Sequence, residues 1–251
     1  MAINNSYDEQ AVADAIARGL KDFYDRLIAS IDKLNIKTIM RRKNPYLYRA
    51  KAIKTSYEIV QSVLNAHISS SEETIFGNCF FEPIAIAASG GDKSLAEGID
   101  VEVKKKHENV IYAIAVKSGT AVFNSSSKKR QEQYFQTAGK LAQQARVAFI
   151  PIIGYGYGKK KESSQEGKLY QELAGQKFWT ELTGDPEFYL KLFRFMGKTP
   201  EQYLELFHES YSRALNRLVL EFGILFCQEN GDIDWEKLVK IVSEDDSAIE
   251  R

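Results

Sequence analysis

Residues 98–119, GIDVEVKKKHENVIYAIAVKSG, restrict the fold of this chain more than any other stretch. The segments VEVKKK and NVIYAIAVK are rich in β-branched and aromatic residues, and the polar residues 107–109 separate them. A polar break between two β-rich runs predicts an antiparallel hairpin. Such a hairpin would bring Asp100, before the first strand, close to Lys117, at the end of the second.

Asp100 and Lys117 together have the chemistry of a metal-dependent phosphodiesterase site. The Asp100 carboxylate can bind a hard cation such as Mg²⁺ through oxygen. The Lys117 ammonium can lie beside the same phosphate, neutralise its charge and orient or activate water. A strand-start aspartate can also simply cap the preceding loop. Lys117 is harder to explain structurally, because it follows the apolar run 114–116, where an unpaired ammonium would be costly to bury.

The order Gly-Ile-Asp, hairpin, then x-x-Lys-Ser-Gly, preceded by SSSEETIFGNCFFE and a glycine-rich loop, resembles the PD-(D/E)XK nuclease superfamily. Within it, the chain is similar to type II restriction endonucleases of the PmeII-like group, because RRKNPYLYRAK (41–51) and GQKFWTELTGD (175–185) resemble that group too. The resemblance implies an α/β fold with a restriction-endonuclease-like core, in which helices flank a mixed central sheet. It also implies helical N- and C-terminal additions, and Mg²⁺ as cofactor.

One carboxylate of the expected site is missing, because Ala115 stands where a nuclease hairpin of this kind usually carries Asp or Glu. We expect Glu82 to supply it, since the helix before the hairpin can reach the metal from the side and related nucleases place an acidic residue there. The resemblance also makes the Val116 carbonyl a metal ligand. The alternatives for the carboxylate are Glu73, Glu102 and Glu132.

Each alternative has a structural explanation. Glu73 follows Ser70 at capping-box spacing, so it can reach back to the helix start. Glu102 lies nearly 7 Å further along the strand than Asp100 and can pair with a nearby lysine. Glu132 lies on the helix after the hairpin, where a solvated helix face would explain it.

Charge distribution favours DNA as the partner, although total charge does not. Lys plus Arg equals Asp plus Glu at 34 each, but residues 33–54 contain eight basic residues and no acidic one. Basic clusters also occur at 104–106, 128–130 and 159–161, while in residues 229–250 acidic residues outnumber basic ones. Solvated surface would explain any single cluster, but together they predict a cationic groove for double-stranded DNA. The expected DNA contacts are Arg41, Arg42, Lys43, Ser118, Asn124, Lys128, Lys129 and Arg130.

Composition and motifs exclude several other classes. The two cysteines, Cys79 and Cys227, have no C-x-x-C spacing, so neither a disulfide framework nor a zinc site is expected. The chain contains no P-loop and no G-x-S-x-G motif, which argues against an NTPase and a serine hydrolase. No apolar run approaches the roughly 18 residues of a membrane span, so we expect no membrane partner and a cytoplasmic location.

Helix signals predict the remaining organisation. Capping boxes at Ser6, Thr55 and Ser70 predict helix starts, with helices over about 56–68 and 71–88, the second kinked or interrupted by Pro83. A helix near 127–146, a buried strand over 147–154 and a helical remainder should follow. We divide the chain into a basic helical segment (1–54), a nuclease core (55–165) and a C-terminal helical region (166–251).

These observations predict a Mg²⁺-dependent type II restriction endonuclease that cuts both strands of a short palindromic DNA site as a homodimer, with a cognate DNA methyltransferase in the same system. One alternative is a DNA-repair or junction-resolving nuclease of the same fold, which would recognise DNA shape. A second alternative is a DNA-binding relative that has lost catalysis, and Ala115 motivates it.

Overall fold

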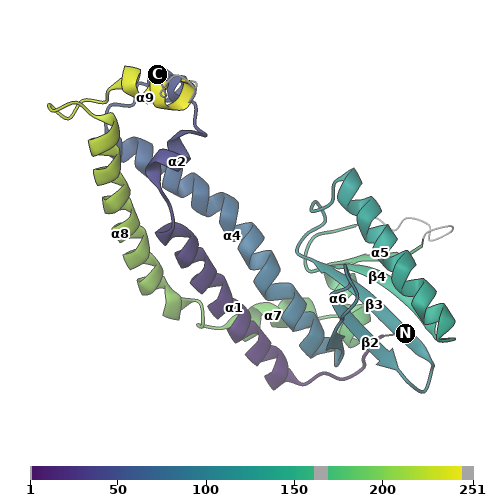
Figure 1. Ribbon diagram of the computed structural model, residues 1–251. Coiled ribbons are helices and arrows are strands. Elements are labelled where there is room, and N and C mark those ends of the chain that lie inside the picture. Colours follow the sequence, from purple (N-terminus) through teal and green to yellow (C-terminus); the bar gives the residue numbers. More distant parts are fainter. Residues whose placement is uncertain (1, 161–168, 245–251) are drawn as a thin grey trace. The chain divides into compact units, whose positions relative to one another are not determined.

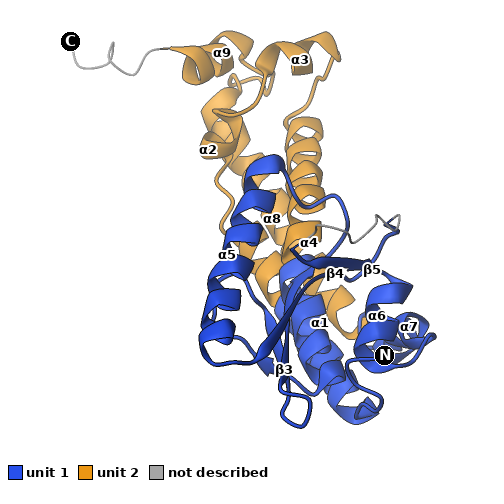
Figure 2. Cartoon of the chain, turned by 90° about the vertical axis from the view of Figure 1, so that its right-hand side faces the viewer, with its two compact units in different colours: residues 1–23, 76–200 blue, residues 24–75, 201–251 orange. Residues whose placement is uncertain are grey.

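The structure is a computed structural model that describes residues 2–160 and 169–244. It forms two compact units, one of residues 1–23 and 76–200, the other of residues 24–75 and 201–251 (Figure 2). Helices α1 (Glu9–Asp32) and α4 (Ser56–Ser89) each contribute to both units. The division at residues 54 and 165 stays a prediction, and its second boundary lies outside the described residues.

The first unit is built on a five-stranded mixed sheet of strand order β1-β2-β3-β4-β5. Strands β1, β2 and β3 pair antiparallel, while β3, β4 and β5 pair parallel. The register Val101↔Ile114 confirms the predicted hairpin. The strand bounds are β1 Asp92–Lys93, β2 Val101–Lys105, β3 Val110–Lys117, β4 Ala148–Tyr155 and β5 Gln171–Ala174.

Helices cover both faces of this sheet, as Figure 1 shows. On one face, Phe135 of α5 (Ser125–Gln144) packs into a buried cluster with Ala113 and Ala115 of β3. On the other face, aromatic rings pack directly against the backbone of Gly154 and Gly156, at the end of β4. A Cβ on Gly154 would lie 2.1 Å from the Phe178 ring of α6 (Gln176–Thr183), so only glycine fits there. The expected α/β architecture with a helix-flanked mixed sheet is confirmed.

Three helix starts were predicted, and one of them is confirmed. The Thr55 and Glu58 side chains hydrogen-bond each other at the start of α4, and each side chain accepts from a backbone N–H. Helix α1 is capped instead by Asp8, whose Oδ1 accepts from the backbone N–H of Gln10 at 2.9 Å. The Ser6 cap was therefore wrong, because an aspartate closer to the helix takes that role.

The predicted helix break at Ser70 is also wrong, because α4 runs without interruption from Ser56 to Ser89. The Ser70 hydroxyl donates to the carbonyl oxygen of His67, one turn back, and does not cap a new helix. Pro83 lies inside this helix without ending it. Near the C-terminal side, β5 is a strand in a region that we expected to be helical.

The second unit is helical in its described part. It contains parts of α1 and α4, together with α2 (Ile36–Met40), α3 (Pro45–Ala50), α8 (Glu201–Phe226) and α9 (Trp235–Ser243). Arg217 of α8 donates to the carbonyl oxygens of Leu34 at 2.8 Å and Asp32 at 3.1 Å. The first unit also holds α7 (Phe188–Met196). Among the helices described, none has the length and apolar character needed to cross a membrane.

Candidate active site

Asp100 and Lys117 meet at the C-terminal end of β3, the central strand of the sheet. The Lys117 ammonium donates to Asp100 Oδ2 at 3.2 Å and to the carbonyl oxygen of Val116 at 3.0 Å. Asp100 Oδ2 also accepts from the backbone N–H of Val116 at 2.6 Å. The side chains of Asp100 and Lys117 are 25% and 27% exposed, so solvent and a substrate can reach both.

A local irregularity of the ladder directs Asp100 toward Lys117. The backbone N–H of Asp100 donates to the carbonyl oxygen of Ile114, although the ladder partner of Ile114 is the next residue, Val101. Two consecutive residues thus face one residue of β3, which is the arrangement of a β-bulge. Bulges change the direction of a side chain at the end of a pairing, and here the carboxylate reaches the last two residues of β3.

The position of Ala115 explains why no carboxylate stands there. Ala115 is completely buried in a cluster with Ile99, Phe135 and Ile153. A carboxylate at this position would lose its hydration against apolar side chains, at a cost of several kcal/mol unless it were paired. A further acidic ligand therefore has to come from another element.

Glu82 of α4 is bound to Lys93 of β1, with 3.0 Å between Oε1 and Nζ. The pKa of Lys93 is raised, first by its hydrogen bond with Glu82, then by the charge of Glu82, and to a smaller extent by the charge of Asp100. Glu82 and Asp100 thus act on the same ammonium group. With 27% of its side chain exposed, Glu82 is as accessible as Asp100.

The alternative carboxylates have other partners or lie elsewhere. Glu102 pairs with Lys104 at 2.9 Å. Glu132 accepts a hydrogen bond from the Tyr170 hydroxyl at 3.1 Å. Glu73 is exposed on the part of α4 that belongs to the second unit. Glu102 is thus paired with a lysine as Glu82 is, and the choice of Glu82 as the second carboxylate stays a prediction.

The donor set suits Mg²⁺. Magnesium prefers oxygen ligands, keeps several waters and binds proteins through one or two carboxylates together with substrate phosphates. Asp100 before β2, the Val116 carbonyl of β3 and Glu82 of α4 supply oxygen of this kind, all within one unit. Within residues 2–160 and 169–244, no three His, Cys, Asp or Glu side chains form a ready metal cage. Mg²⁺ would not require one, because it could take waters and substrate phosphate oxygens beside two carboxylates.

Three of the residues expected to contact DNA belong to the first unit and have structural contacts. Ser118 packs against Gly77 of α4, where a Cβ would lie 3.0 Å from Ser118 Cβ. The Asn124 side chain accepts from the backbone N–H of Ser127 at 2.8 Å and so caps α5. Lys128 lies 3.6 Å from Glu172.

The other expected DNA contacts are exposed or partly exposed cations in both units. Lys129 and Arg130 are exposed on the first turns of α5. In the second unit, Arg41 and Arg42 are exposed and Lys43 is half-buried, directly before the Asn44 cap of α3. The exposed members of this group are accessible from solvent.

Sequence reasoning missed a polar cluster around Glu172 of β5. The Glu172 side chain is only 8% exposed, accepts from the Tyr155 hydroxyl at 2.8 Å and is also hydrogen-bonded by the Lys160 ammonium. Burial acts to raise the pKa of Glu172, but the hydrogen bonds from Lys160 and Tyr155 and the nearby lysine charges outweigh it, so its pKa is lowered. Burial and the same carboxylate raise the pKa of Tyr155. Glu172 thereby holds Lys128 and Lys160 beside β5.

Comparison with known protein families identifies a match. The model for type II restriction endonuclease EcoO109I matches residues 10–203, well over half of the 251-residue chain. No curated protein matches the chain. The match supports the restriction-endonuclease part of the resemblance and does not support the PmeII-like group. It covers the hairpin, Glu82 and the Glu172 cluster, and the chain belongs to the family of type II restriction endonuclease EcoO109I.

Proposed function

We propose that this protein is a Mg²⁺-dependent type II restriction endonuclease that hydrolyses both strands of double-stranded DNA at a short palindromic site. The observation that carries the proposal is the contact of Asp100, Lys117 and the Val116 carbonyl at the end of β3, in a chain of this family. Asp100, Glu82 and the Val116 carbonyl would hold the ion, since they offer the oxygen ligands it prefers.

Hydrolysis of a phosphodiester requires water to attack phosphorus in line with the leaving oxygen while negative charge builds on the phosphoryl oxygens. Mg²⁺ held by Asp100, Glu82 and the Val116 carbonyl would supply Lewis-acid stabilisation of that charge and would make water more acidic. Lys117, held by Asp100 and the Val116 carbonyl, places a fixed positive charge beside the phosphate and orients the attacking water. Because its ammonium is already in place, little reorganisation accompanies the reaction.

Symmetry supports a homodimer as the active form. A palindromic site presents two equivalent strands, and two equivalent active sites related by a two-fold axis would cut both. Lys128, Lys129, Arg130, Arg41, Arg42 and Lys43 would contact phosphates, with Ser118 and Asn124 close to the bases. A cognate DNA methyltransferase would protect the host site. Sedimentation velocity of the protein with a cleaved duplex, with Ca²⁺ in place of Mg²⁺, tests the dimer.

The decisive experiment is incubation of the purified protein with unmethylated phage DNA, with Mg²⁺ or with EDTA, followed by sequencing of the fragment ends. We expect discrete Mg²⁺-dependent fragments whose ends share one short palindrome. Asp100→Asn and Lys117→Met should each lower the cleavage rate at least about 100-fold, the cost of removing one preorganised charged group. Both variants should bind the cleaved sequence with Ca²⁺ present as the wild type does.

Two other results would replace this proposal. Tight binding of DNA without cleavage, whatever divalent ion is added, would identify a catalytically inactive relative, for which the buried Ala115 is the structural argument. Nicking that follows DNA structure and not sequence would identify a repair or junction-resolving nuclease.

A further inference from the structure

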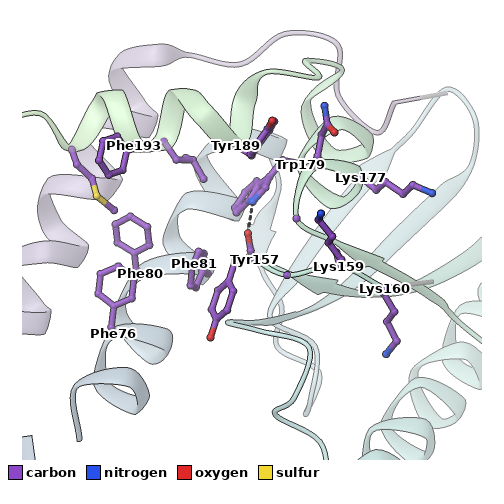
Figure 3. A pocket seen from close by; sticks show the side chains of 17 residues that line it. Phe76, Phe80, Phe81, Tyr157, Lys159, Lys160, Lys177, Trp179, Tyr189 and Phe193 are labelled. Atoms are coloured by element: carbon purple, nitrogen blue, oxygen red, sulfur yellow. Dashed lines mark hydrogen bonds between the residues drawn. The ribbon is translucent and has the colours of Figure 1, made fainter. Parts of the chain in front are cut away.

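A cavity of about 830 Å³ lies beyond the end of β4, among residues of α4, α6 and α7 that all belong to the first unit (Figure 3). Aromatic side chains form most of its apolar wall: Phe80, Phe81, Tyr157, Trp179, Tyr189 and Phe193. Cavities of this volume bind flat organic ligands in many proteins. Neither the metal ligands nor Lys117 accounts for this concentration of rings.

The floor of the cavity is made of buried side chains, while the side chains at its rim are exposed. Trp179 is fully buried and donates from Nε1 to the carbonyl oxygen of Gly156 at 2.8 Å, the dashed line of Figure 3. Phe80 is 2% exposed. In contrast, Tyr157 and Phe193 are 52% and 79% exposed. Aromatic faces left in water at the mouth of a preformed apolar cavity are typical of a binding site.

The charge at the mouth suits a phosphate-bearing ligand. Lys159 and Lys177 line the cavity and are both exposed. Lys177 is the second residue of α6, whose N-terminus carries the positive end of the helix dipole. No Asp or Glu of the described chain lines the cavity. A nucleotide has a flat base and a negatively charged phosphate. The aromatic wall of the cavity suits the base, and the lysines at its mouth suit the phosphate.

Backbone hydrogen bonds join the cavity to the proposed catalytic strand. The N–H of Gly156 donates to the carbonyl oxygen of Lys117 at 2.8 Å, and the N–H of Tyr157 donates to that of Ser118 at 2.9 Å. The Tyr157 ring packs on Gly119, where a Cβ would lie 2.7 Å from its Cζ. The cavity therefore lies close to the C-terminal end of β3, where Lys117 stands. DNA bound at the proposed site would pass near it.

We infer that this cavity receives a nucleobase unstacked from the bound DNA, with the adjoining phosphate at Lys159 and Lys177. The inference rests on the proposed function, because it assumes a DNA substrate. Proteins that draw a base out of the duplex hold it between aromatic and apolar side chains. Stacking on aromatic rings accepts any base, since every base has a π-face, so the cavity needs no base-specific hydrogen bond.

Binding of two fluorescein-labelled duplexes tests the inference. One duplex is fully paired, the other carries a single unpaired adenine at its centre, and Ca²⁺ replaces Mg²⁺. Because the unpaired base needs no energy for unpairing, the wild type should bind the bulged duplex about fivefold or more tightly, the lower end of the stacking contribution of one base. Tyr157→Leu and Phe193→Leu retain apolar bulk but lose the ring, and each should abolish that preference.

Leu190→Ala is the matched control, because Leu190 lies on α7 with 39% exposure and does not line the cavity. It should retain the wild-type preference. Equal affinity of the wild type for the two duplexes would overturn the inference, and so would a preference that persists in a Tyr157→Leu, Phe193→Leu double variant. A fall in molecular mass of the Phe193→Leu variant on light scattering, with the preference intact, would show instead that a second copy of the chain covers the cavity.

Failure of this inference is distinguishable from failure of the proposed function. If the wild type cuts phage DNA with Mg²⁺ and binds the paired duplex but shows no preference, only the base-binding cavity is excluded. If it neither cuts phage DNA nor binds either duplex, the DNA substrate itself is excluded.

Discussion

Glu82 is the carboxylate that we propose as the second metal ligand beside Asp100, and its partner Lys93 also responds to the charge of Asp100. Glu82→Gln keeps the shape and removes the charge, so we expect cleavage with saturating Mg²⁺ to fall about 100-fold while the fold is retained. Glu102→Gln is the control, since Glu102 pairs with Lys104. Single-turnover cleavage rates measure both. If Glu82→Gln cleaves DNA normally and Glu102→Gln or Glu132→Gln loses cleavage, the glutamate replaced in the inactive variant would be the second metal ligand instead of Glu82.

The lowered pKa of Glu172 predicts how the stability of the fold changes as the pH falls. Its pKa is lowered in the folded protein from an ordinary value of 4.5, so it stabilises the fold above that pH and loses this contribution as the pH falls through its folded pKa. Glu172→Gln should therefore melt below the wild type at pH 7, and the two curves should converge once the wild-type carboxyl is protonated. Melting temperature against pH measures the effect. Glu209→Gln, a surface partner of Arg213, should show no such convergence.

At the scale of single elements, two glycines have opposite roles. Gly154 of β4 has no room for a Cβ, which would lie 2.1 Å from the Phe178 ring, so Gly154→Ala should cost about 1–3 kcal/mol through overpacking. Gly223 of α8 has nothing within 4 Å of that position, so Gly223→Ala should stabilise by about 1 kcal/mol through helix propensity. Urea unfolding of both variants tests the pair. A loss of stability in Gly223→Ala would contradict this account.

Elements with a local pattern were predictable from sequence, and those that depend on distant partners were not. The alternation of β2 and β3 and their polar turn predicted the hairpin, and with it the Asp100–Lys117 contact. The break at Ser70 was wrong because a local capping signal does not end a helix that continues to pack. Strand β5 has only four residues and exists by pairing with β4. The Glu172 cluster escaped prediction for the same reason, since the sheet joins residues from three separate segments.

At the scale of the whole molecule, each compact unit draws on distant parts of the chain, and the N-terminal segment ties the first unit together. The backbone N–H groups of Ile3 and Asn4 donate to the carbonyl oxygens of Glu181 and Leu182 at 2.6 and 3.1 Å. The Ile3 side chain is 2% exposed. Its burial contributes about 1.5–3 kcal/mol and each hydrogen bond about 0.5–1.5 kcal/mol.

Removal of residues 2–7, just before the Asp8 cap of α1, should therefore destabilise the protein by about 2.5–6 kcal/mol, seen as a lower melting temperature and a lower urea midpoint. Ile3→Ala should reproduce part of the loss, while Asn5→Ala, at an exposed position, should not. An unchanged midpoint after removal would show that the segment is not part of the folded core.

The two lysines bound to Asp100 and Glu82 have a consequence for the order in which a complex assembles. Each of these two carboxylates is paired with a lysine in the structure, so neither Asp100 nor Glu82 presents an unpaired negative charge to an approaching DNA backbone. If the protein acts as proposed, DNA would be able to bind first, and the arrival of a divalent ion would then set the moment of the cut without deciding where the protein binds. In such a molecule, searching along DNA and cutting it would be separate in time.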